Sequence, residues 1–118
     1  MARTDDVVWF EFVESKVFSK HVGELPAEIL TNIQSDLVQN PERGVIVKGT
    51  HGVRKARVLT RTRHADCGSY RYLYLYLEHA GRIHLLYLFS KGEQADLSPD
   101  QTRIIGALSQ QIRRERVS

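Results

Sequence analysis

The chain has a single cysteine among its 118 residues, which excludes an internal disulfide and any zinc site built from several cysteines. Long apolar runs are missing too, since no stretch approaches the roughly 18 consecutive apolar residues of a membrane-spanning helix. The N-terminal residues lack the basic-then-apolar pattern of a secretory signal. We therefore expect a cytoplasmic protein with no membrane contact. The length predicts one domain, residues 1–118, around one hydrophobic core.

Acidic side chains are scarce between residues 48 and 71. That segment holds seven basic residues and one acid, so its local net charge is +6, whereas the whole chain carries +3. The first forty residues, by contrast, hold three basic and seven acidic side chains. A basic block within a foldable, apolar-rich stretch is typical of a surface that binds a polyanion, most often nucleic acid. A charge run can also be only a solvated face, and composition leaves that alternative open.

The order of the predicted elements indicates an α+β domain with an antiparallel sheet. The apolar spacing predicts helices over residues 14–22 and from Pro26 to residue 39, and a third helix begins at a capping box that starts with Ser98. Tyrosine alternates with leucine up to residue 77, so we expect a central strand whose tyrosines pack in the core rather than stack on bases. Strands are predicted at residues 7–13, 53–60, 70–77 and 83–89, with a short apolar run at 45–47.

The basic block includes a predicted strand on which the cations share one face. Lys55 and Arg57 project from one side of that strand, whereas Arg54, Ala56 and Val58 project from the other. Ala56 and Val58 are expected to face the core, which leaves Lys55 and Arg57 on the open face. Arg71, at the start of the next strand, would add a third cation. Rigid strands hold such a group of charges well, which favours a phosphate-binding site over a merely solvated face.

The same strand carries a family signature. Residues 49–57 read Gly-Thr-His-Gly-Val-Arg-Lys-Ala-Arg, which resembles the G-T-x-G-hydrophobic-R-K-x-R signature of HigB-type toxins, within the RelE/ParE superfamily of toxin–antitoxin modules. Other similar segments follow in the family's order over nearly the whole chain. They are the opening at 12–15, the N-P-x-x-G turn at 40–44, the strand entry at 68–71 and the ending at 85–97.

The resemblance implies both a fold and an activity. The implied fold is RelE-like: an antiparallel sheet with two N-terminal helices packed on it and a C-terminal helix. The implied activity is that of a type II toxin, a ribosome-dependent mRNA interferase that contacts 16S rRNA and cuts mRNA in the ribosomal A site. A helix-turn-helix antitoxin of the HigA type would neutralise it. Relatives cleave without a metal or other cofactor, because the mRNA's own 2′-hydroxyl attacks the neighbouring phosphate.

That reaction needs a base, cations for the developing charge and a proton donor. By motif, Lys55 is the candidate base, Arg57 and Arg71 stabilise charge, and Lys91 is a further cation that can act at the leaving group. A lysine acts as a base only where neighbouring cations and burial favour its neutral form. The remaining RNA-binding candidates are basic or aromatic: Arg54, Arg61, Arg63, His64, Tyr87 and Phe89.

Two departures from the family pattern support an alternative function. The loop over residues 61–69 keeps positive charge but lacks the family's lysines and one of its glycines. Phe89 stands where relatives have a tyrosine, and a phenylalanine can stack on a base but cannot transfer a proton. Tyr87 is either its substitute or a core residue. The alternative is therefore a catalytically weakened module that binds RNA, the ribosome or an antitoxin on the same fold. Gyrase inhibition, as in ParE relatives, fits the signature less well.

Overall fold

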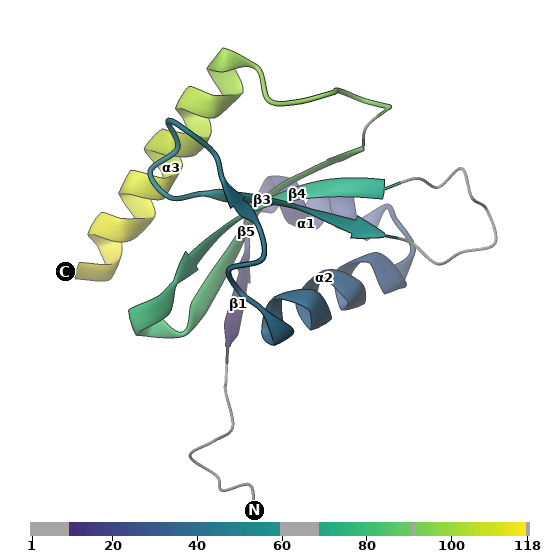
Figure 1. Ribbon diagram of the computed structural model, residues 1–118, viewed down its shortest axis with the longest axis horizontal. Helices are drawn as coiled ribbons and strands as arrows, with labels where there is room; N and C mark the ends of the chain where they lie inside the picture. The colour runs from purple at the N-terminus through teal and green to yellow at the C-terminus, as the bar shows by residue number, and fades with distance from the viewer. Residues whose placement is uncertain (1–9, 60–68, 91, 118) are drawn as a thin grey trace, which may run out of the picture.

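The helices and strands follow the order that the sequence predicts: one strand, two helices, a run of strands and a last helix (Figure 1). The fold is described here from a computed structural model, which describes residues 10–59, 69–90 and 92–117. Within these residues no helix is both long and apolar enough to cross a bilayer. The elements are β1 (Glu11–Glu14), α1 (Lys16–Gly23), α2 (Ala27–Gln39), β2 (Val45–Ile46), β3 (Arg54–Leu59), β4 (Ser69–Leu77), the 3-10 turn η3 (Glu78–Ala80), β5 (Arg82–Ser90) and α3 (Pro99–Val117).

The five strands form one sheet in the order β1-β5-β4-β3-β2, with β4 at the centre. Three of the four strand pairs are antiparallel, but β1 runs parallel to β5. The expected α+β class is therefore confirmed, whereas the expectation of a wholly antiparallel sheet is wrong at this edge. The pattern of residues 11–14 marks a strand but not its direction, which depends on a partner strand about seventy residues away in the chain.

Each face of the sheet has its own apolar core. Helices α1 and α2 pack on one face through Phe18, Ile29, Ile33 and neighbouring residues. Helix α3 packs on the other face, mainly through Ile105, so it lies across the sheet from α1 and α2 (Figure 1). The central strand β4 is thus covered on both sides, as its alternating tyrosines and leucines predict.

The tyrosines of β4 belong to the core beneath α1 and α2. Tyr72 and Tyr74 have no exposed surface, and the hydroxyl of Tyr74 donates to the Pro41 carbonyl and accepts from the Gly44 amide. A Cβ on Gly44 would lie 2.9 Å from the Tyr74 ring, which explains the glycine of the N-P-x-x-G turn. Burial raises the pKa of Tyr72 to about 12, and Arg43 donates to its hydroxyl. Core packing is confirmed for both rings.

The glycines and the threonine of the G-T-x-G segment build a tight turn before β3. Gly49 and Gly52 have φ angles of +85° and +97°, which side-chain-bearing residues rarely adopt. Thr50 is fully buried between them. Its hydroxyl donates to the Val47 carbonyl at 2.6 Å and accepts from the Val53 amide at 3.2 Å, closing the turn on itself. The first half of the family signature is therefore structural.

Helix α3 is held by hydrogen bonds at its start and again where it packs on the G-T-x-G turn. At its start, the Ser98 hydroxyl accepts from the Gln101 amide and the Gln101 side chain accepts from the Ser98 amide, so the predicted capping box is confirmed. Further along, α3 docks on the G-T-x-G turn, where Ser109 donates to the His51 carbonyl at 2.9 Å. A Cβ on Gly106 would lie 2.8 Å from the Gly49 carbonyl oxygen, so the helix and the turn approach as closely as only glycine permits.

This close approach predicts that Gly106→Ala destabilises the protein, even though alanine favours a helix over glycine by about 1 kcal/mol. The added methyl group must push α3 off the turn, which we expect to cost about 1–3 kcal/mol. Gly23→Ala is the matched control in α1, because nothing lies within 4 Å of its Cβ position. Urea unfolding of both variants measures the difference, and a Gly106→Ala protein as stable as wild type would contradict this packing.

Candidate nucleic-acid interface

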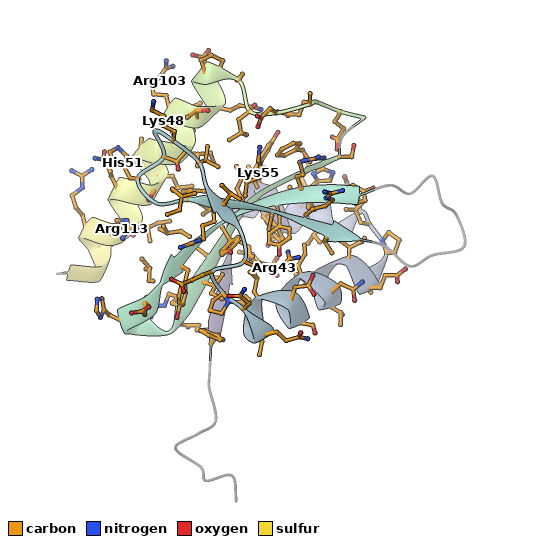
Figure 2. All side chains as sticks on the ribbon, viewed as in Figure 1. Arg43, Lys48, His51, Lys55, Arg103 and Arg113 are labelled. Atoms are coloured by element: carbon orange, nitrogen blue, oxygen red, sulfur yellow. The ribbon has the colours of Figure 1, made fainter. Side chains whose placement is uncertain are left out.

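Strand register brings the predicted cations onto one face of the sheet. Arg57 of β3 lies directly opposite Arg71 of β4, and Arg71 lies opposite Phe89 of β5. A second cross-strand row, two residues away along each of these strands, begins with Lys55 on β3 and ends with Tyr87 on β5. Cross-strand partners and residues two apart project from the same side of a sheet, here the side on which α3 packs. Figure 2 shows Lys55 on this face, away from Arg43 at the end of α2.

Two like charges face each other at the centre of this row. Opposed like charges on neighbouring strands destabilise a sheet, so the Arg57–Arg71 pair carries a cost in the absence of a ligand. Arg57 is exposed, whereas Arg71 is half-buried. The Nη1 atom of Arg71 is buried without a hydrogen-bond partner among the described residues. An oxyanion bound between the two guanidinium groups would offset both costs.

One acid reaches the cations from the connection between β5 and α3. Asp96 Oδ1 lies 3.0 Å from Lys55 Nζ, and the pair is partly exposed, with 29% of the lysine side chain and 65% of the aspartate side chain accessible. The hydrogen bond from Lys55 lowers the pKa of the Asp96 carboxyl, helped by the Leu97 amide and by the charge of Arg71. Sequence reasoning missed Asp96 because 41 residues separate it from Lys55. The family-like ending at 85–97 contains it, but gives no sign of its partner.

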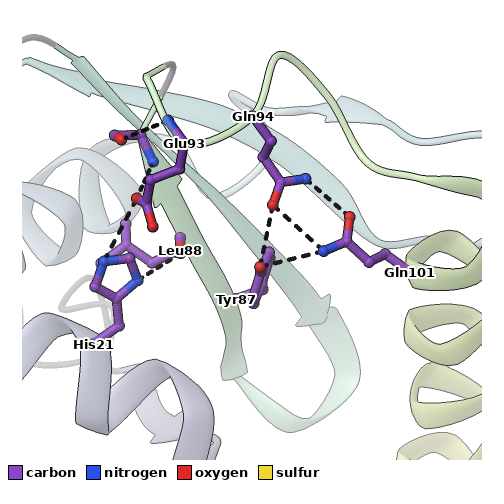
Figure 3. A network of polar contacts seen from close by, with 7 residues as sticks. His21, Tyr87, Leu88, Glu93, Gln94 and Gln101 are labelled. Atoms are coloured by element: carbon purple, nitrogen blue, oxygen red, sulfur yellow. Dashed lines mark hydrogen bonds and ion pairs between the residues drawn. The ribbon is translucent and has the colours of Figure 1, made fainter.

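A hydrogen-bonded network ties Tyr87 to the start of α3 (Figure 3). The Tyr87 hydroxyl donates to the Gln94 side-chain oxygen and accepts from Gln101 Nε2, both at 3.3 Å. Gln94 Nε2 in turn donates to Gln101 Oε1 at 2.9 Å and to the Asp96 carbonyl at 2.7 Å. Tyr87 is half-buried in these contacts. It therefore supports the segment that carries Asp96.

The β5–α3 connection is also fastened at its beginning (Figure 3). The Glu93 carboxylate accepts from the Ser90 amide at 2.8 Å and lies 3.7 Å from His21 of α1. His21 Nδ1 is 2.8 Å from the Leu88 carbonyl oxygen, so this corner joins α1 to β5. The hydrogen bond from the Ser90 amide, the largest cause, lowers the pKa of Glu93. The segment from residue 92 to 97 is thus held at both ends.

Two other predicted residues are less accessible than the RNA-binding role expects: one lies on the opposite face and the other is buried. Arg54 points the opposite way, towards the α2–β2 connection, where it donates to the Gly44 carbonyl at 2.7 Å and the Glu42 carbonyl at 3.0 Å. Phe89 is on the cation face, but its side chain is only 1% exposed and packs 5.8 Å from the Tyr87 ring centre. Phe89 therefore offers no surface to a base in this conformation, whereas 20% of the Arg54 side chain is exposed, on the other face of the sheet. Four predicted residues lie outside the described part of the chain: Arg61, Arg63, His64 and Lys91.

Comparison with solved structures identifies the fold. The sequence matches no protein-family model. The isolated E. coli RelE toxin is 12% identical, with a TM-score of 0.53 over 85% of this chain and 99% of that one. A double mutant of E. coli RelE in its free state gives 12% identity, a TM-score of 0.52 and coverage of 73% and 87%. A chain of the intact E. coli RelBE toxin–antitoxin complex is 13% identical, with a TM-score of 0.53 over 70% of this chain and 96% of that one.

These likenesses define the class of fold: the chain has the RelE-like α+β architecture that its motifs predict. At 12–13% identity they extend to the fold and not to the chemistry of single side chains. The HigB subtype therefore continues to depend on the motifs, above all on the G-T-x-G and R-K-x-R segment.

The opposed arginines predict a gain in stability when one of them is neutralised. Arg57→Gln should raise the free energy of unfolding by about 0.2–1 kcal/mol, because it removes a like-charge cross-strand pair at an exposed position. The gain should be larger at about 0.01 M salt than at about 1 M salt, where the charges are screened. Urea unfolding at both salt concentrations measures it.

Arg82→Gln is the matched control for this measurement. Arg82 is the cross-strand partner of Glu11, and its Nε lies 2.7 Å from the Glu11 carboxylate. The substitution therefore removes a favourable ion pair from the same sheet. It should leave stability unchanged or lower it slightly. If Arg57→Gln lowered the free energy of unfolding as much as Arg82→Gln does, the repulsion between the opposed arginines would already be compensated within the protein.

Proposed function

We propose that the protein is a cytoplasmic toxin of the HigB type, a ribosome-dependent mRNA interferase neutralised by a HigA-like helix-turn-helix antitoxin. The observation that carries this proposal is the Arg57–Arg71 pair, held opposite each other beside Lys55 on one face of a rigid sheet. Such a cluster suits the phosphodiester backbone of RNA better than a neutral ligand. The RelE-like fold and the order of the family motifs support the choice of mRNA and of ribosomal contacts, including 16S rRNA.

The proposed reaction makes the bond between the 2′-oxygen and phosphorus and breaks the bond from phosphorus to the 5′-oxygen. The products are a cyclic phosphate and a free 5′-hydroxyl. Arg57 and Arg71 would stabilise the negative charge that develops on the phosphate oxygens. Lys55 would take the proton of the 2′-hydroxyl. In the RNA-free protein Lys55 donates to Asp96, so that contact must open before Lys55 can reach the 2′-hydroxyl.

The 5′-oxygen must gain a proton as it leaves. Lys91 is the candidate donor carried over from the family motif, and it lies outside the described residues. Among the described residues the Tyr87 hydroxyl is a second candidate, because Tyr87 ends the cross-strand row that begins with Lys55. Its present hydrogen bonds to Gln94 and Gln101 would have to be exchanged for one to the leaving oxygen.

A second candidate function is a non-catalytic module that binds RNA, the ribosome or an antitoxin through the same face. It is favoured by the burial of Phe89, which has no hydroxyl, and by the engagement of Lys55 and Tyr87 in contacts within the protein. Such a module would bind RNA with a strong salt dependence, each phosphate contact adding about −0.7 to the slope of log K against log salt. It would release no cleaved product.

Inducible expression with mapping of mRNA 5′ ends tests the main proposal. Wild type should arrest growth and leave new 5′ ends within translated codons, whereas Lys55→Ala, Arg57→Ala and Arg71→Ala should each relieve the arrest. Loss of one charge stabiliser should slow cleavage by about 10²–10³-fold. Arg103→Ala is the matched control, because Arg103 is an exposed cation on α3 that pairs with Asp100.

Three outcomes would count against the proposal. Harmless wild-type expression with intact ribosome-bound mRNA would exclude the interferase. Growth arrest that persists in Lys55→Ala and Arg71→Ala would move the activity away from this face. Salt-sensitive RNA binding without new 5′ ends would select the binding module instead.

A further inference from the structure

Asp96 is a fixed anion rather than a mobile surface charge. Its Oδ1 accepts from Lys55 Nζ at 3.0 Å and also from the backbone amide of Leu97 at 2.8 Å. A carboxylate that bonds the amide of the next residue has its side-chain rotation restricted. The Leu97 side chain packs in the core under α3, which holds the backbone in place. The carboxylate is therefore presented to Lys55 by the fold.

Hydrogen bonds that begin at the start of α3 also hold the backbone of Asp96 in place. The Asp96 carbonyl accepts from Gln94, and Gln94 also bonds Gln101 and Tyr87 (Figure 3). Gln101 is at the same time a member of the capping box with Ser98. A chain of hydrogen bonds thus runs from the helix cap to the backbone carbonyl of Asp96, the residue whose carboxylate faces Lys55. Such a connected polar chain costs more to rearrange than its separate bonds suggest.

The contact uses the same chemistry as a phosphodiester. Both a carboxylate and a phosphate accept charge-assisted hydrogen bonds from an ammonium group, and Lys55 is the donor that either would use. The charge of Arg71 acts on Asp96 as well, since it contributes to the lowered pKa of that carboxyl. The ion pair is partly exposed, and pairs of this kind contribute only about 0–1 kcal/mol. It is weak enough for a polyanion to displace.

We propose that Asp96 occupies the anion-binding position of Lys55 in the RNA-free protein and competes there with the phosphodiester backbone of RNA. This inference rests on the proposed function, because that function supplies RNA as the ligand. Binding of RNA then breaks the Lys55–Asp96 pair and leaves Lys55 against the RNA backbone, where the proposed reaction needs it to take the proton of the 2′-hydroxyl. Bare RNA must displace the carboxylate with few other contacts, so the competitor lowers affinity for RNA that the ribosome does not position.

The test measures binding of a single-stranded 2′-O-methyl RNA oligonucleotide, which lacks the attacking hydroxyl and cannot be cleaved. Asp96→Asn should lower the Kd by about two- to five-fold, since it removes the competing charge and the pair contributes at most about 1 kcal/mol. Asp100→Asn is the matched control: it removes a carboxylate from the first turn of α3 that pairs with Arg103 instead. Its effect on the Kd should be smaller. Thermal unfolding verifies that both variants remain folded.

A double-mutant cycle with Lys55→Gln assigns the effect to the pair. The gain from Asp96→Asn should shrink in the Lys55→Gln background, because no ammonium group remains to be exposed. Equal or weaker RNA binding by Asp96→Asn than by wild type, including no binding by either, would overturn the inference. The inference would also be overturned if Asp96→Asn tightened RNA binding no more than Asp100→Asn does, or if its gain were the same in the Lys55→Gln background.

The failure of this inference is distinguishable from failure of the proposed function. If Lys55→Gln and Arg57→Gln weaken RNA binding while Asp96→Asn brings no gain, the face binds RNA and Asp96 is not its competitor. If Asp96→Asn tightens binding but wild type yields no new mRNA 5′ ends, the competitor is supported and the interferase activity is not. If Asp96→Asn slows cleavage but leaves the Kd for RNA unchanged, Asp96 is a positioning residue for Lys55 and the proposed competition with RNA is overturned.

Discussion

The register between β3 and β4 is the constraint on which the site depends. Side chains alternate between the two faces of a strand, so a slip by one residue would exchange the faces of every partner. In the observed register the β4 tyrosines enter the core beneath α1 and α2, and the leucines enter the core under α3. Arg71 stands at the end of the leucine face and Arg57 directly across from it. The core residues therefore determine where the charges lie, and the charges have no other face available.

The family signature combines two physical tasks in nine residues. Its first half forms a turn in which Thr50 bonds the backbone on both sides, and on which Gly106 lets α3 dock closely. Its second half is a strand that sends Lys55 and Arg57 to the open face, whereas Arg54 holds the α2–β2 connection through two carbonyls. The turn positions α3, the start of α3 positions Asp96, and Asp96 bonds Lys55. Both halves thus meet again in the site.

Sequence alone predicts the parts of this fold that depend on local periodicity. The tyrosine–leucine alternation identified the central strand, and the Ser98–Gln101 capping box marked the start of α3. The period of two also placed Lys55 and Arg57 on a common face, since that needs only the strand assignment. These inferences succeed because each depends on residues that are close together in the chain.

The features that sequence missed all depend on distant partners. The parallel direction of β1 is set by its pairing with β5, and hydrophobic pattern carries no information on direction. Asp96 reaches Lys55 only because the connection between β5 and α3 returns across the sheet. Strand alternation alone puts Arg54 on the opposite face from Lys55 and Arg57, whereas its hydrogen bonds to the Glu42 and Gly44 carbonyls depend on where the α2–β2 connection lies in space.

The energetics of the cation face favour a site that is adapted to its ligand rather than to stability. Opposed arginines and the buried Nη1 of Arg71 are both costs in the RNA-free protein, and Asp96 offsets them only in part, because one carboxylate serves Lys55 and acts on Arg71 from a partly exposed position. A fully neutralised cluster would be more stable but would bind a phosphate less well, since every fixed acid must be displaced. A single weak competitor is the arrangement that limits repulsion while leaving net positive charge for a polyanion. The same balance agrees with the proposed RNA-binding role, because the face folds without a ligand and keeps the net positive charge that attracts polyanions.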